Sequence, residues 1–342
     1  MCDEKLISIH LNSNRPDNFN KFIISLISNA IEIKYIEVIV SIDKNDIAML
    51  DIIRNINIKY PNLITSIETD LIKSFSDAWK PLNILLKNTS NSVRYISCMS
   101  DEIIFQTKSW DSKILKYDNF FNDNIFRIRC SKNRNEVYSD IWECGYKPES
   151  IAFYTKKWLD AVGQWNPCIG PDTFQECVSY YMNNYGRKYQ RNIIDFDLKF
   201  DGEEVSENLN LKERIKRSRI YYKAFFKLMS YKVQNIASLS AYNLVNAIDN
   251  TNTINNYIQI SRKKTYFRNF TRRFNFFYYR GSKNHIIDTK TKNFIFMIWC
   301  YIEFFDNHII KVLRFLYKTR YLEKVIKNEK KFKQIEKVLK SE

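Results

Sequence analysis

Glycine is scarce in this chain of 342 residues: there are only six, and none comes before Gly145. The Gly-rich loops that cradle nucleotide phosphates, G-x-G-x-x-G and G-x-x-x-x-G-K, therefore cannot occur before that residue. Histidine is also rare, and three histidines argue against a His-rich zinc site. A nucleotide bound by the first part of the chain must be held by other groups.

Paired cysteines and long apolar runs are lacking as well. The seven cysteines are scattered without a C-x-x-C pair, which is typical of buried thiols in a reducing compartment. No signal peptide is visible at the acidic N-terminus. The longest strongly apolar stretch, residues 294–305, is interrupted by Glu303 and is shorter than the about 20 residues that a membrane span needs. We therefore expect a cytoplasmic protein.

Positive charge is concentrated in the second part of the chain. Residues 1–200 carry 25 basic and 25 acidic side chains, whereas residues 201–342 carry 29 and 13, so the net charge of +16 arises after residue 200. A neutral part followed by a basic part suggests catalysis in the first and contact with an anionic surface in the second. The alternative is a solvated helical tail. We place the boundary between a domain of residues 1–205 and a basic, mainly helical region of residues 206–342.

Short apolar strands alternate with amphipathic helices along the first hundred residues. A hydrophobic content of 45% argues against global disorder. The alternation predicts an α/β fold with a mostly parallel sheet flanked by helices. Strands are expected at residues 5–11, 36–42, 63–67 and 93–99, and again at 125–129 and 150–154. Helices are expected from Pro16, over residues 46–58 and 76–86, from Trp110, and over residues 173–182.

Acidic side chains stand where an α/β sheet would gather them. Asp43 ends the second strand, Asp101 and Glu102 follow the fourth, and Asp172 lies in a loop-to-helix turn. Because the carboxyl ends of adjacent parallel strands face one crevice, we expect these acids to lie close together. Carboxylates suit Mg²⁺ or Mn²⁺, which would offset the charge of a diphosphate. Taken singly, each acid is equally compatible with a helix N-cap or a solvated turn.

Three segments of the chain carry recognisable motifs: residues 9–16 with 38–43, residues 100–105 with Trp110-Asp111, and residues 165–176. In the first, a strand, an R-P loop and a helix precede a strand that ends in Asp. In the second, an acidic pair precedes a Trp-Asp segment, and in the third an acid precedes a helix. These motifs resemble those of family 2 glycosyltransferases with the GT-A fold, the nucleotide-diphospho-sugar transferase fold. The resemblance covers about residues 4–185.

The resemblance implies a reaction class. A member of this family moves a sugar from a nucleotide-sugar donor, with a UDP-sugar favoured, to a hydroxyl of a glycan or lipid-linked acceptor. Synthesis of surface polysaccharide or glycoconjugates is the setting that this implies. The resemblance places Asp172 at the position of the catalytic base. Glu176, one helical turn later, is an alternative for that role.

The same resemblance assigns the donor contacts. Asp43 corresponds to the acid that contacts the nucleoside, and Asp101 and Glu102 to the pair that reaches the ribose and a Mn²⁺ or Mg²⁺ ion. Glu102 stands where the family usually has Asp. Arg15 lies in the first loop, from which its guanidinium can pair with a donor phosphate.

The basic region carries its own pattern. Residues 262–283 hold eight Lys or Arg, eight aromatic residues and no acid, and residues 303–318 fit an amphipathic helix. Packing within the protein is the commoner use of such a helix. The alternative is peripheral contact with an anionic membrane through residues 262–318. We expect no specific nucleic acid. Two alternatives for the whole chain are a protein that binds nucleic acid through this region and a catalytically inactive membrane-surface adaptor.

Overall fold

The computed structural model describes residues 4–72, 77–130, 151–168, 170–195, 197–202, 228, 230–250 and 257–260. The chain divides into two compact units, Met1–Asn275 and Phe276–Glu342, and all of the described residues belong to the first. The predicted boundary at residues 205–206 and the predicted membrane contact of residues 262–318 lie outside the described residues and stay predictions. No helix among the described residues is long and apolar enough to cross a membrane.

The strands are β1 (Ile7–Asn12), β2 (Ile36–Asp43), β3 (Ile64–Thr69), β4 (Tyr95–Cys98), β5 (Ile103–Phe105), β6 (Arg127–Cys130), β7 (Ala152–Thr155), β8 (Asn192–Asp195) and β9 (Phe200–Gly202). The helices are α1 (Pro16–Asn29), α2 (Ile47–Lys59), α3 (Leu82–Lys87), α4 (Trp110–Leu115), α7 (Lys156–Val162), α8 (Pro171–Asn183) and α10 (Tyr231–Asp249). Two 3₁₀ turns, η1 (Ile33–Tyr35) and η3 (Arg187–Tyr189), complete the described elements.

Seven strands form one sheet in the order β3-β2-β1-β4-β7-β6-β8. The pairs β3–β2, β2–β1, β1–β4 and β6–β8 are parallel, and only β7 runs against its two neighbours. β5 and β9 form a separate antiparallel pair. The predicted fold class, α/β with a mostly parallel sheet flanked by helices, is confirmed.

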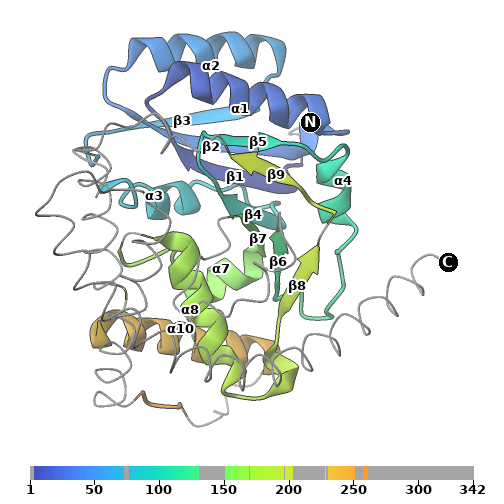
Figure 1. The fold of residues 1–342 in the computed structure, drawn as a ribbon, viewed down its shortest axis with the longest axis vertical. Helices are drawn as coiled ribbons and strands as arrows, with labels where there is room; N and C mark the ends of the chain where they lie inside the picture. The colour runs from blue at the N-terminus through green and yellow to red at the C-terminus, as the bar shows by residue number, and fades with distance from the viewer. Residues whose placement is uncertain are drawn as a thin grey trace, which may run out of the picture. The chain divides into compact units, whose positions relative to one another are not determined.

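The helices cover both faces of the sheet (Figure 1). α1 and α2 lie on one side, and α3, α7, α8 and α10 lie on the other. α1 begins at Pro16, whose fixed φ suits the first helical turn, and it buries Phe19, Phe22 and Leu26. α2 begins after Asp46, whose carboxylate accepts a hydrogen bond from the backbone N–H of Met49. Local sequence therefore explains where these helices begin.

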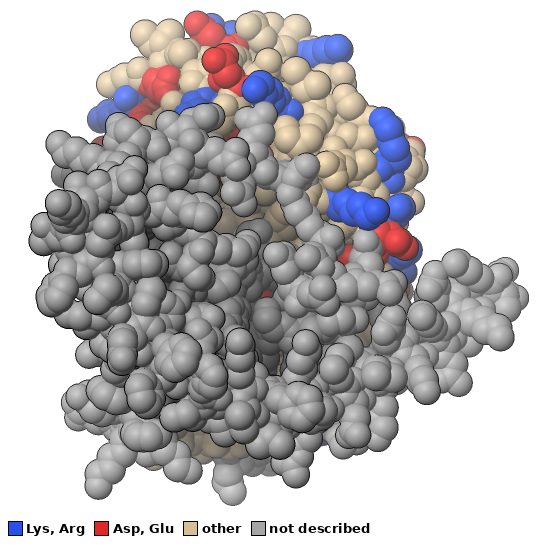
Figure 2. All heavy atoms as spheres, in the orientation of Figure 1, with Lys and Arg blue, Asp and Glu red and all other residues tan. Residues whose placement is uncertain are grey.

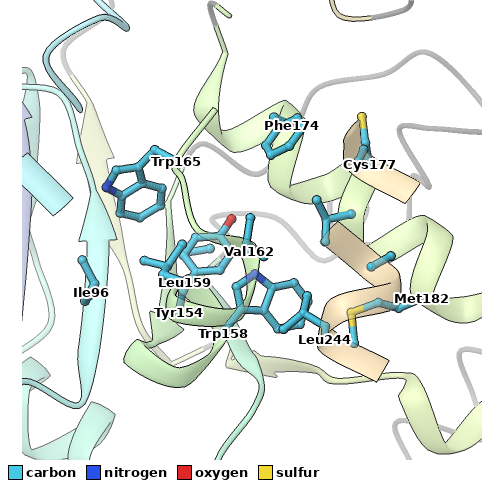
Figure 3. Close-up of a cluster of buried hydrophobic side chains, with 14 of the residues drawn as sticks. Ile96, Tyr154, Trp158, Leu159, Val162, Trp165, Phe174, Cys177, Met182 and Leu244 are labelled. Atoms are coloured by element: carbon cyan, nitrogen blue, oxygen red, sulfur yellow. The ribbon is translucent and has the colours of Figure 1, made fainter. Parts of the chain in front are cut away.

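The second face of the sheet carries the main aromatic core (Figure 3). This core joins side chains from several elements: Tyr154 of β7, Trp158 of α7, Trp165 of the loop before α8, Phe174 of α8 and Leu244 of α10. The ring of Tyr154 meets that of Trp165 edge to face, with 5.5 Å between the centroids, and meets that of Trp158 in a tilted arrangement. This core fixes α8 against the sheet, and α8 carries two of the predicted site residues.

Some elements differ from the sequence prediction. α7 was not predicted; it begins where the Thr155 hydroxyl accepts from the backbone N–H of Trp158 and ends at Gly163, which has a φ of 77°. α8 begins at Pro171 rather than at residue 173, so Asp172 stands in its first turn. The predicted helix over residues 76–86 shortens to α3, with Pro81 before its first residue, and Ser76 lies outside the described residues.

Candidate active site

The candidate site lies at the carboxyl ends of β2, β1 and β4. β1 pairs with β2 on one side and with β4 on the other, so the chain changes direction across the sheet between β1 and β4. In open α/β sheets, ligands bind outside the carboxyl ends of the strands at such a switch point. The loop after β1, residues 13–15, lies between the acids that follow β2 and β4.

Arg15 holds the acidic pair that follows β4. Its NH1 donates to Glu102 Oε1 at 2.7 Å, its Nε donates to Asp101 Oδ2 at 3.2 Å, and its NH2 pairs with Asp101 Oδ1. The Ser13 hydroxyl donates a further bond to Asp101 Oδ2 at 2.6 Å. Asp101 is only 3% exposed, and these hydrogen bonds offset the cost of burying its carboxylate. The structure thus brings together three of the predicted site residues.

Asp43 joins the same group through the loop. Asn14 Nδ2 donates to Asp43 Oδ2 at 3.2 Å, and both side chains reach solvent. Beneath them, the buried Ser41 hydroxyl donates to Asn12 Oδ1. The loop after β1 therefore contacts one acid on each side, Asp43 after β2 and Asp101 after β4. Asp43 remains open to a ligand.

The Trp-Asp segment after the acidic pair is a structural support. The Trp110 indole donates to the carbonyl of Leu26 at 3.1 Å and its ring lies 4.7 Å from that of Phe105. The buried Asp111 carboxylate accepts from the backbone N–H groups of Ile31 and Glu32 at 2.8–3.0 Å. Because these bonds tie the end of α1 to α4, they fix the segment that carries the acidic pair.

His10, in the centre of the sheet, anchors the loop that leads to α8. The Trp165 indole N–H donates to His10 Nδ1 at 2.9 Å, and Nε2 lies 3.0 Å from the Thr89 hydroxyl. Burial lowers the pKa of His10 to about 3, so the ring is neutral and carries its proton on Nε2. Nε2 then donates to Thr89, whose hydroxyl is 3.4 Å from the carbonyl of Leu85. One directed chain of hydrogen bonds thus joins the loop to β1 and α3.

Gln175 and Asn83 hold the same loop from two other sides. Gln175 Nε2 donates to the carbonyls of Gln164 and Trp165, and its Oε1 accepts from the Trp158 indole. Asn83 Oδ1 accepts from the backbone N–H of Trp165 at 2.7 Å. These bonds fix Gln164 and Trp165, which lie before α8 in the chain.

Asp172 stands in the first turn of α8. It follows Gly170, which adopts a φ of 90° that an L side chain rarely tolerates. Burial raises the pKa of Asp172 to about 6, with the charge of Glu176 adding to the effect and hydrogen bonds from Thr173 opposing it. Burial and then the charge of Asp172 raise the pKa of the Cys98 thiol at the end of β4. Asp172 is thus an electrostatic neighbour of the strand that leads to Asp101.

Glu176 lies one turn later in a different environment. Its two oxygens accept from NH1 and NH2 of Arg127, each at 2.8 Å, and Arg129 Nε lies 3.5 Å from Oε1. Burial raises the pKa of Glu176, but the charges of Arg127 and Arg129 lower it by more. The pKa of Glu176 is therefore below its ordinary value. Glu176 is therefore held ionised as half of a buried ion pair.

The donor set for a metal ion is incomplete. No group of three or more His, Cys, Asp or Glu side chains in the described ranges is arranged to hold a metal ion. Asp101 and Glu102 offer hard carboxylate oxygens, but Arg15 already contacts both residues. Mg²⁺ commonly takes one or two carboxylates together with substrate phosphates. The pair therefore fits a divalent cation only when a diphosphate supplies further oxygens.

Sequence reasoning missed several residues that shape the site. Ser13 and Asn14 lie in the recognised loop and are short polar residues next to Arg15, a signal that was available. Arg127 reads as an ordinary strand residue, and its role depends on α8 lying opposite. His10 and Trp165 are 155 positions apart in the chain, so no local pattern connects them.

No protein-family model matches the chain, and no curated protein matches it either. Several solved structures resemble it. A mannosyltransferase from Pyrobaculum calidifontis in complex with GDP-Man and Mn²⁺ is 12% identical, with 72% of this chain and 76% of that chain covered and a TM-score of 0.49. TarS from S. aureus in complex with UDP is 11% identical, with 83% and 94% covered and a TM-score of 0.45. Glucosyl-3-phosphoglycerate synthase from Mycobacterium tuberculosis is 11% identical, with 72% and 80% covered and a TM-score of 0.41.

These similarities concern the fold and assign no residue. The roles of individual side chains towards a donor, a metal ion or an acceptor therefore depend on the geometry of this chain alone.

Proposed function

We propose that this chain is a glycosyltransferase that moves a sugar from a nucleotide-sugar donor, with a UDP-sugar favoured, to a hydroxyl of a glycan or lipid-linked acceptor. The observation that supports it most is the loop at the switch point of the sheet, in which Asn14 contacts Asp43 and Arg15 contacts Asp101. A guanidinium suits a phosphate, and an open carboxylate beside it suits the polar edge of a nucleoside. Charged side chains thus take the place of the Gly-rich loop with which other folds hold a nucleotide phosphate.

A divalent cation completes this proposal. Asp101 and Glu102 would hold Mn²⁺ or Mg²⁺ together with oxygens of the donor diphosphate. When bound, the cation would supply electrostatic stabilisation of the departing diphosphate. Asp101 is buried and held by Ser13, so its carboxylate is already oriented. Glu102 is less buried, and its longer side chain reaches farther from the end of β4.

For the base, we propose Asp172 rather than Glu176. A general base works best with a pKa near the working pH, and the pKa of Asp172 is raised to about 6. Asp172 would accept the proton of the acceptor hydroxyl while that oxygen bonds to the anomeric carbon and the bond from this carbon to the diphosphate breaks. Glu176 is committed to Arg127 through two hydrogen bonds, which makes it a poor proton acceptor.

The test is calorimetry with UDP, with and without Mn²⁺. We expect binding to the wild type and at least about fivefold weaker binding to Asp101→Asn, because a charged contact is worth on the order of 1 kcal/mol or more. Asp118→Asn is the matched control, since Asp118 pairs with Arg94 before the start of β4. The absence of heat with every nucleoside diphosphate tested, with or without metal, would exclude a nucleotide-sugar transferase.

A further inference from the structure

We propose that Arg15 is the resident counter-cation of Asp101 and Glu102, and that a divalent cation reaches this pair only after a diphosphate has drawn the guanidinium away. The two cations would thus exchange at one acidic pair during donor binding. The second half of this inference rests on the proposed donor site, whereas the first half concerns the pair alone.

The contacts of Arg15 are those of an occupied cation site. Each of its three guanidinium nitrogens has a carboxylate partner, and together they engage both oxygens of Asp101 and Oε1 of Glu102. The Ser13 hydroxyl donates a fourth hydrogen bond to the acidic pair, and its acceptor is Asp101 Oδ2. A metal ion bound at these oxygens would lie within a few ångströms of a guanidinium that cannot lose its proton. Both cations therefore cannot hold the pair at once.

Burial explains why a resident cation is needed. Asp101 is 3% exposed and Glu102 follows it directly, so the empty pair would place two negative charges together at the end of a buried strand. An uncompensated buried charge is strongly unfavourable. Arg15 lowers this cost through a side chain that stays 39% exposed, which leaves it room to move.

A donor diphosphate supplies the alternative partner. Its oxygens accept from guanidinium groups as readily as carboxylates do, and they are also ligands for a divalent cation. Arg15 can therefore pass from the carboxylates to the phosphates when the donor binds, which leaves the acidic pair open to a divalent cation. The cation alone offers Arg15 no new partner, so it should bind weakly to the empty protein.

The experiment measures binding of Mn²⁺ alone, from the free-ion signal in electron paramagnetic resonance, without nucleotide. We expect Arg15→Gln to bind Mn²⁺ about fivefold more tightly than the wild type, because the guanidinium no longer competes for the two carboxylates. Mn²⁺ should also raise the melting temperature of Arg15→Gln and leave that of the wild type unchanged. Arg94→Gln is the control, since Arg94 is a half-exposed arginine paired with Asp118 away from the site.

The outcomes separate this inference from the proposed function. Should Arg15→Gln fold poorly, Arg15→Lys replaces it: one ammonium cannot span both carboxylates as a guanidinium fork does, so Mn²⁺ should again bind more tightly than to the wild type. Equal Mn²⁺ affinity of the wild type and the folded Arg15 variant overturns the exchange. Failure of UDP to bind overturns the transferase proposal, while tighter Mn²⁺ binding by Arg15→Gln would still support Arg15 as the resident cation.

Discussion

Substitution of Glu176 and Asp172 separates a structural carboxylate from a catalytic one. In Glu176→Gln the shape of the side chain is kept, but Arg127 and Arg129 lose the charge that faces them. Arg127 is buried and donates two hydrogen bonds of 2.8 Å to Glu176. Removal of one partner of a buried ion pair typically costs about 3 to 5 kcal/mol. We expect a loss of unfolding free energy in that range.

Asp172→Asn should act in the opposite direction on stability. Burial raises the pKa of Asp172 from its ordinary value to about 6, so its ionised form is disfavoured in the folded protein. The stability that the protonated carboxyl contributes is complete below pH about 4 and is lost as the pH rises through about 6. Above that pH, Asn should stabilise the protein by at most about 3 kcal/mol. Release of UDP from a UDP-sugar should nevertheless fall by about a hundredfold or more.

Urea unfolding at pH 5 and pH 8, together with the rate of UDP release, distinguishes the two roles. For the wild type, kcat/KM should rise with pH around an apparent pKa of about 6 and level off above it. Activity of Glu176→Gln should track its folded fraction. The reasoning is refuted if Glu176→Gln is as stable as the wild type, or if Asp172→Asn turns over donor normally while Glu176→Gln, fully folded, does not.

Three further substitutions probe the supports of the site. His10→Ala removes the acceptor of the Trp165 indole, so chemical denaturation should show a loss of about 2 to 4 kcal/mol, and His10→Asn should recover part of it. Asp111→Ala leaves the backbone N–H of Ile31 without its carboxylate, and a thermal melt should report a loss of about 1 to 3 kcal/mol. Gly170→Ala places a Cβ at a φ of 90°, and we expect a loss of about 1 to 2 kcal/mol with a larger fall in kcat than in donor affinity.

Elements whose signals are local were predicted well from the sequence. β1, β2, β3 and β4 are apolar runs that the structure contains within one to two residues, and α1 and α2 begin at a proline and at an Asp cap. On the part of the described surface that Figure 2 shows, Lys and Arg lie among Asp and Glu, as the equal counts of basic and acidic residues in 1–200 predict. The parallel sheet then follows from strand–helix alternation.

Features that depend on distant partners were beyond local reasoning. β5 pairs with β9, whose residues lie 95 or more positions along the chain, and neither three-residue strand has a periodic signal of its own. α7 spans seven residues, which is too short to show a helical pattern. The gathering of Asp43, Asp101 and Arg15 was foreseeable from strand order, whereas the direct pairing of Arg15 with the acids required its side-chain position.

The two carboxylates of α8 show why residue type and spacing alone do not assign a base. Asp172 and Glu176 are four positions apart and therefore project from the same side of the helix. What separates them is β6, which places Arg127 against Glu176 and leaves Asp172 in the first turn beside the end of β4. One carboxylate is stabilised as an anion and the other is pushed towards its neutral form. Environments that drive neighbouring pKa values apart are how a protein divides structural from acid–base work. An Arg127→Met substitution should therefore raise the pKa of Glu176 and, through the shared charge, alter the pH at which Asp172 titrates.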